Sequence, residues 1–210
     1  MQRELSMAHM IGVIGSLIGI GAGLASLVNV FNMSTLTVGA YITEVGLWIL
    51  WFILQGSAFL AIYRERNDNA ALAAFILAVI SALIEASTMM VLLSAPSITE
   101  IAEALATLLQ LFFAVLIGTF TEAAYLIFSG IAVMHMTRYD VKESIAYSAG
   151  IVLIITGCVV GFGLFGPLSL FIPFFIMAAN IMACILFISP QSSEYQRVRV
   201  EESDSGLGLQ

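Results

Sequence analysis

The sequence predicts an all-α integral membrane protein, a bundle of six transmembrane helices arranged as three hairpins. Of its 210 residues, 60% are hydrophobic and only 10% are charged, and the mean hydropathy is +1.04. A soluble domain carries about 45–50% apolar and about 25% charged residues. The apolar residues also form six runs near the length of about 20 residues that crosses a bilayer. Together these observations exclude a water-soluble globule and a disordered chain.

The six predicted spans use nearly the whole chain and leave no room for a soluble enzyme domain. Turn-forming or charged residues occupy each break between them. We expect one transmembrane domain over residues 1–188, followed by a polar cytoplasmic tail over 189–210. The predicted spans are residues 7–31, 41–63, 70–94, 108–136, 145–165 and 168–188.

The distribution of basic residues predicts the orientation. Cytoplasmic loops of membrane proteins collect Lys and Arg. With six spans and the N-terminus inside, all seven basic residues fall on the inner side. We therefore expect both termini to be inside. A plasma membrane is expected because it is the common location of such a chain. A continuous helix from residue 97 to 136 would be about 60 Å long, so the fourth helix is expected to protrude on the outer side or to break near Gly118.

Two acidic residues, Glu85 and Glu122, interrupt the third and fourth spans. Counted along the helices, each lies about 21–23 Å from the inner end, so both are expected at one level. A charged acid at mid-membrane costs about 2.5–3.5 kcal/mol, and no Lys or Arg lies in any predicted span. We expect at least one of the two to be protonated, or both to hold a cation. The pair predicts a proton or cation relay; the alternative is a protonated glutamate in an interhelical hydrogen bond.

Other polar side chains accompany these acids at helical spacing. Some share a helix with Glu85 or Glu122, and two belong to the fifth and sixth spans. They are predicted to support the relay, the alternative being ordinary hydrogen bonds between helices. These residues are Ser81, Thr88, Thr119, Tyr125, Ser129, Thr156 and Asn180.

Three further acids, Glu44, Glu100 and Glu103, belong to the predicted outer side. No basic residue is expected there, so they would make an electronegative vestibule that concentrates cations. The alternative is a solvated outer surface.

Two histidines, His9 and His135, are predicted near the inner surface, and methionines flank both. Imidazole and thioether groups together suit copper(I), and two histidines at equal depth can bind haem. A haem or copper site is therefore one alternative. The other is that both histidines lie at the membrane interface. No other cofactor is predicted.

Small residues in the first span predict close helix packing. Gly15, Gly19 and Gly23 repeat every four residues, a spacing that lets helix backbones approach in lipid. Their partner is either a helix of the same chain or another subunit. Trp48 and Trp51 are expected to be packing residues. Pro173 can kink the sixth span.

The sequence contains none of the motifs H-E-x-x-H, G-x-S-x-G or a P-loop, and it has no basic patch for nucleic acid. We predict a small transporter or channel for a proton, a cation or a proton-coupled small solute. The alternative is a non-catalytic subunit of a larger membrane complex, or a haem- or copper-binding membrane protein. The expected partners are the bilayer, a small cation or solute, and a second copy or other membrane subunits.

Overall fold

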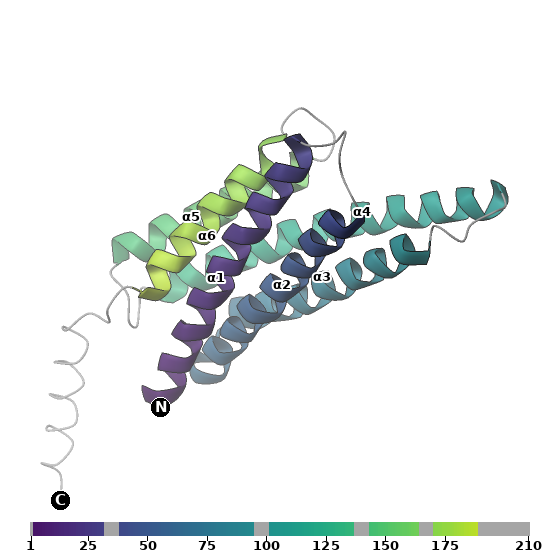
Figure 1. Cartoon of the computed structure of the whole chain (residues 1–210). Coiled ribbons are helices and arrows are strands. Elements are labelled where there is room, and N and C mark those ends of the chain that lie inside the picture. Colours follow the sequence, from purple (N-terminus) through teal and green to yellow (C-terminus); the bar gives the residue numbers. More distant parts are fainter. Residues whose placement is uncertain (1, 32–37, 95–100, 137–142, 164–169, 189–210) are drawn as a thin grey trace, which may run out of the picture.

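The protein is all-α in the part of the chain that the computed structural model describes, residues 2–31, 38–94, 101–136, 143–163 and 170–188. Six helices follow one another along the chain (Figure 1). They are α1 Gln2–Phe31, α2 Val38–Arg66, α3 Asn69–Ser94, α4 Ile101–His135, α5 Glu143–Gly163 and α6 Ile172–Ile188.

Helices α1 to α5 are long and apolar enough to cross a membrane. The chain is therefore a multi-pass helical membrane protein that lies in a lipid bilayer. Helix α6 has 17 residues and a length of about 26 Å, slightly less than the hydrocarbon thickness of about 30 Å. Pro173 is its second residue. In a first helical turn the missing N–H of proline costs nothing, so Pro173 begins α6 and does not kink it, contrary to the sequence-based expectation.

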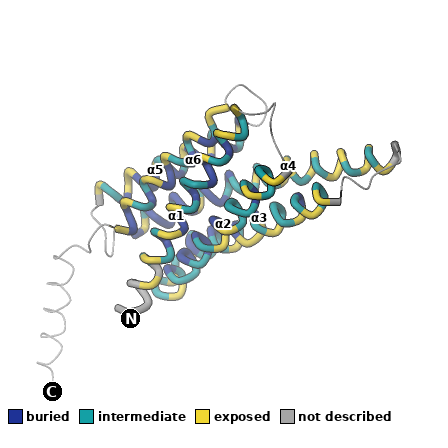
Figure 2. Tube along the Cα trace, in the orientation of Figure 1, coloured by how far each residue is buried: buried dark blue, intermediate teal, exposed yellow. Residues whose placement is uncertain are grey.

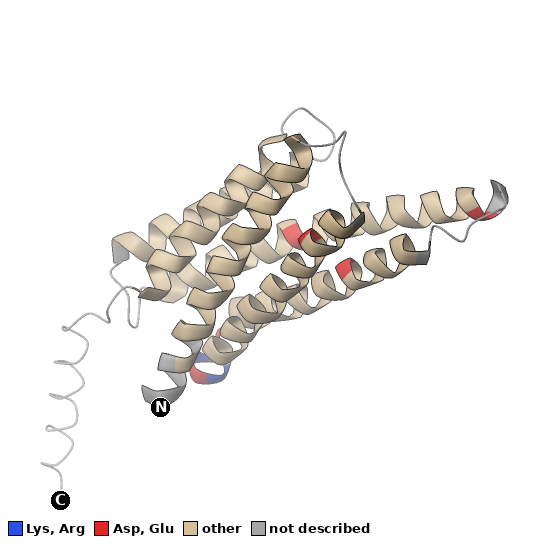
Figure 3. Cartoon of the chain, in the orientation of Figure 1, with Lys and Arg blue, Asp and Glu red and all other residues tan. Residues whose placement is uncertain are grey.

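The six helices form a closed ring. Each packs against its neighbours in the sequence, and α6 packs against α1. We call the end of the ring where α2 finishes with Arg64 and Arg66 the basic end, and the opposite end the distal end (Figure 3). The N-terminus lies at the basic end. The other five basic residues lie outside the described side chains, as does the tail 189–210, so the orientation in the membrane stays a prediction.

The turn between α2 and α3 consists of Asn67 and Asp68 alone. Asn67 has a φ of 54°, a left-handed conformation that asparagine tolerates better than most residues. The Asp68 carboxylate accepts a 2.8 Å hydrogen bond from the backbone N–H of Ala70. It therefore caps the first turn of α3.

Glycines set the packing of α1. A Cβ on Gly19 would lie 2.4 Å from Oδ1 of Asn180 in α6, and one on Gly23 would lie 2.5 Å from Cγ of Met177. Gly15 instead faces Gln55 of α2. All three glycines thus meet helices of the same chain.

A second glycine contact joins α4 to α5. A Cβ on Gly130 would lie 2.6 Å from the carbonyl oxygen of Gly150, and one on Gly157 would lie 2.7 Å from that of Ala123. These helices approach backbone to backbone, which only small residues allow. The pattern Gly157-x-x-x-Gly161 is a sequence signal for this contact.

Helix α4 is unbroken over 35 residues, a length of about 52 Å. It extends beyond the distal end of α3 (Figure 1), and none of residues 103–122 is buried (Figure 2). Of the two expectations for this helix, protrusion is therefore correct and a break near Gly118 is wrong.

Candidate functional site

Glu122 lies on the side of α4 that faces the other helices of the ring. Four residues before it, Gly118 meets α3, where a Cβ would be 3.2 Å from Cγ2 of Ile84. Three residues after it, Tyr125 is buried against aromatic rings of α2. Glu122 shares the helix face between these two contacts, and its side chain is partly buried.

The aromatic enclosure of Tyr125 comes from Trp51, Phe52 and Phe59, whose ring centroids lie 5.4, 5.5 and 6.3 Å from that of Tyr125. The rings meet edge to face, an arrangement that the aromatic quadrupole favours. This cluster fixes the rotation of α4 about its axis. It therefore also fixes the direction in which Glu122 points.

Glu85 likewise lies on the side of α3 that faces the other helices of the ring. Its side chain is partly buried. Ser81 and Thr88, one turn away on either side, are both buried. Residues at i, i+4 and i+7 share a helix face, so Glu85 lies on the packed face of α3.

The two acids are offset along the helix pair. Because Gly118 lies opposite Ile84, Glu122 lies opposite the region of Ser81, four residues earlier on α3. Glu85 is one residue beyond Ile84, so the carboxyl groups are offset by about 7 Å along the axis. Counting residues from the helix ends predicted one level for both. The contact of His135 with Asp68 supports the offset, since it pairs α4 with α3 in the same register as the contact of Gly118 with Ile84.

Neither Glu85 nor Glu122 makes a hydrogen bond or an ion pair within the described residues. Glu122 interacts electrostatically with Glu85, and Glu85 in turn interacts with Glu44 of α2. The site is thus a set of carboxyl groups that interact electrostatically with one another and have no cationic partner among the described residues.

The predicted supporting residues fall into two groups. The hydroxyls of Thr88, Thr119 and Thr156 donate to backbone carbonyls of their own helices at 3.0, 2.8 and 2.7 Å. Asn180 is bonded within the core, to Trp51 and to the backbone of α6. None of these hydrogen bonds goes to Glu85 or Glu122.

Three other predicted residues lie on the faces that carry the acids. Tyr125 and Ser129 follow Glu122 on α4, and their hydroxyls lie next to each other. The buried hydroxyl of Ser81 has no hydrogen-bond partner in the described part of the chain. The hydroxyl of Ser129 has none either, so Ser81 and Ser129 both keep unused hydrogen-bonding capacity within the described residues.

The predicted outer vestibule is not a single feature. Glu44 belongs to the packed region, where Ser26 and Asn29 of α1 both donate to its carboxylate. Glu103 is exposed near the distal tip of α4, and Glu100 lies outside the described residues. The structure therefore separates Glu44 from Glu103 and joins it to α1.

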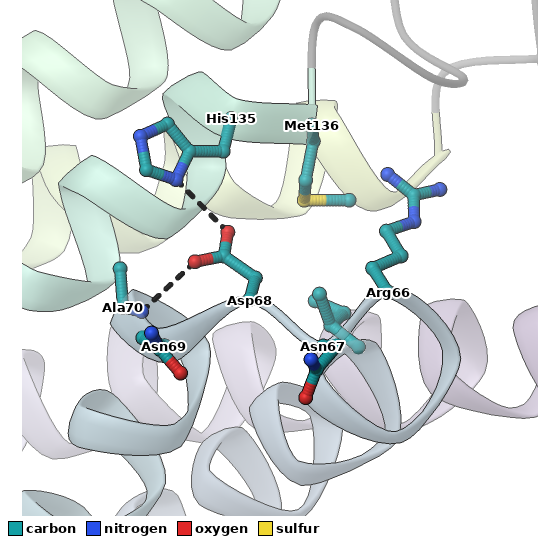
Figure 4. A pocket seen from close by; sticks show the side chains of 8 residues that line it. Arg66, Asn67, Asp68, Asn69, Ala70, His135 and Met136 are labelled. Carbon is teal, nitrogen blue, oxygen red and sulfur yellow. Dashed lines mark hydrogen bonds and ion pairs between the residues drawn. The ribbon is translucent and has the colours of Figure 1, made fainter.

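The two histidines lie in different surroundings at the basic end. The His9 ring packs edge to face against Phe187 at a centroid distance of 6.0 Å. Nδ1 of His135 lies 3.0 Å from Oδ2 of Asp68. Both residues line a pocket of about 310 Å³, together with Arg66 and Met136 (Figure 4). Among the side chains described, no three His, Cys, Asp or Glu residues gather closely enough to hold a metal.

No protein-family model, curated protein or solved structure matches this chain.

Sequence analysis missed one buried polar contact. Nε2 of Gln55 donates to Oγ of Ser16 at 2.8 Å and lies 3.3 Å from the carbonyl oxygen of Gly12. The signal was present, because a glutamine inside an apolar span requires partners. This contact ties α2 to α1 and does not reach the acids.

Proposed function

We propose that the protein is a small membrane transporter or channel for a proton, a cation or a proton-coupled small solute, with Glu85 and Glu122 as its relay. One observation carries the proposal. Two carboxyl groups lie on the packed faces of adjacent helices inside apolar spans, and neither has a hydrogen bond or ion pair with the described residues.

The lack of partners argues against a purely structural role. A buried acid that stabilises helix packing does so by an interhelical hydrogen bond, and neither glutamate makes one in the described ranges. Holding an unpaired carboxyl in an apolar span is unfavourable. An intramembrane acid that is kept at such an energetic disadvantage is typical of proton and ion pathways.

The proposed topology has six spans, with α6 as the sixth. Its basic end would face the cytoplasm in a plasma membrane, because basic residues collect on that side. The pathway would then run from the distal end, outside, toward the basic end, inside.

The test is reconstitution of the full chain into liposomes that contain a pH-sensitive dye. Glu85→Gln and Glu122→Gln each remove one carboxyl and preserve its shape, and we expect each to reduce pH-dependent flux by about a hundredfold. Glu103→Gln, the same change at an exposed acid, is the matched control. Wild-type flux in the Glu85→Gln/Glu122→Gln double variant would refute the relay.

A second candidate is a non-catalytic subunit of a larger membrane complex. The distal half of α4 favours it, because residues 103–117 are exposed or only half-buried and include the exposed Gln110 within an apolar surface. A partner helix could satisfy the amide of Gln110, whereas lipid cannot. Purification in a mild detergent tests this candidate: a stoichiometric membrane partner supports it, and a single solitary species contradicts it.

A further inference from the structure

We infer that three proton carriers, Glu44 of α2, Glu85 of α3 and Glu122 of α4, follow one another from the distal end toward the basic end. Glu44 is the first of them. This inference depends on the proposed function above. It adds a residue that sequence reasoning had assigned to an outer vestibule, and it narrows the cargo to the proton.

The steps follow from how the helices face each other. A Cβ on Gly56 would lie 2.9 Å from Cβ of Ala78, so these residues match between α2 and α3. Glu44, twelve residues before Gly56, is therefore level with residue 90 of α3, five residues beyond Glu85. The step from Glu44 to Glu85 is about 7 Å along the axis, equal to the step from Glu85 to Glu122.

The electrostatic interactions have the same order. Glu85 interacts with Glu44, and Glu122 interacts with Glu85. The other titratable groups near these carriers are Tyr41, which interacts with Glu44 and Glu85, and Tyr125, which interacts with Glu122. All of them are acids or phenols, so no cation in this set neutralises the three carboxyl groups.

Glu44 is held in place by neutral donors. Ser26 donates to one of its carboxylate oxygens and Asn29 to the other. The indole of Trp48 donates to Ser26 at 3.3 Å. A carboxylate offers about four lone-pair positions, so both oxygens keep capacity for a proton or a water molecule.

Ser81 supplies an independent observation. Ser81 is 2% exposed, and its hydroxyl has no hydrogen-bond partner within the described ranges. Ser81 shares a helix face with Glu85 and is level with Glu122. An unsatisfied buried hydroxyl is unfavourable by about 1–3 kcal/mol, and a water molecule between the last two carriers would satisfy it.

The spacing favours the proton over a metal ion. A calcium ion needs about six to eight oxygens at about 2.3–2.6 Å, so carboxyl groups about 7 Å apart along the axis are poorly placed to share one. A proton needs one oxygen at a time. Carriers this far apart exchange the proton through intervening water. In each step an O–H bond breaks on the donor carboxyl, each intervening water accepts one proton and gives up another, an O–H bond forms on the acceptor carboxylate, and the donor is left as a carboxylate.

The experiment measures proton uptake by liposomes that hold the full chain, with Glu44→Gln compared against Glu103→Gln. We expect Glu44→Gln to slow uptake by about tenfold or more, Glu44→Asp to restore most of it, and Glu103→Gln to match wild type. Because Glu44 also anchors α1 through Ser26 and Asn29, thermal unfolding of each variant is measured beside its uptake. Glu44→Gln, which can still accept from Ser26, should lose uptake while keeping most of the wild-type stability.

The outcomes separate this inference from the proposed function. Wild-type uptake in Glu44→Gln, with Glu85→Gln blocked, overturns the role of Glu44 alone. Loss of uptake in Glu44→Asp as well as in Glu44→Gln, with both variants unfolding at a lower temperature than wild type, shows that Glu44 is an anchor and also overturns that role. Sodium or potassium uptake without a proton gradient, blocked by Glu85→Gln, overturns the proton as cargo. Wild-type uptake in the Glu85→Gln/Glu122→Gln variant overturns the proposed function itself.

Discussion

The indole Nε1 of Trp51 donates a 2.8 Å hydrogen bond to Oδ1 of Asn180 and joins α2 to α6 across the ring. Both side chains are buried, and Asn180 donates in turn to the carbonyl oxygen of Ile176. This contact accounts for two polar groups inside apolar spans by packing alone.

Replacing Asn180 by Leu should destabilise the protein, because it leaves the buried indole N–H without a partner. The expected loss is about 1–3 kcal/mol, measured as the free energy of unfolding in detergent micelles. Trp51→Phe/Asn180→Leu removes both partners and should lose less than the two single variants together. Additive losses would show that the bond contributes nothing.

A pair of glycines on α1 offers a matched comparison. Gly19 faces Asn180, whereas a Cβ on Gly21 would meet no atom within 4 Å. Both lie inside the same helix, so replacement by Ala brings the same gain in helix propensity. Gly19→Ala should destabilise by about 1–3 kcal/mol through overpacking, and Gly21→Ala should be neutral or stabilising. Thermal unfolding followed by circular dichroism distinguishes them, and equal effects would contradict the α1–α6 contact.

The sequence predicted most of the helices because an apolar span must be long enough to cross the bilayer. Helix α4 departs from this, since it begins at Ile101 and the predicted span begins at residue 108. The predicted third span began at residue 70, and α3 begins at Asn69. The α1–α6 contact could not be predicted in this way, because sequence alone does not show which helices close a ring. The step between Glu85 and Glu122 was missed for another reason: counting from helix ends assumes that all ends lie in one plane, and side-chain packing sets the actual register.

The cap at Asp68 gives a third prediction. Asp68 bonds the N–H of Ala70 and lies 3.0 Å from His135, whose side chain is 49% exposed. Losing a helix cap costs about 0.5–2 kcal/mol, whereas an exposed ion pair contributes about 0–1 kcal/mol. Asp68→Ala should therefore destabilise more than His135→Ala, and Asp68→Asn, which still caps, should stay near wild type. Chemical unfolding at low and high salt measures this, and a larger loss for His135→Ala would contradict it.

A variant at Ser81 distinguishes a structural role of this site from a functional one. Ser81→Ala removes a buried hydroxyl that has no partner in the described part of the chain, so the free energy of unfolding should stay constant or rise. Proton uptake should nevertheless fall by about tenfold, since water between Glu85 and Glu122 loses a ligand. Ser87→Ala is the control, because Ser87 lies on the exposed side of α3 and bonds the carbonyl oxygen of Ile84 at 2.9 Å. Unchanged uptake in Ser81→Ala would mean that the hydroxyl takes no part in the pathway, and a large loss of stability would mean that it has a structural partner.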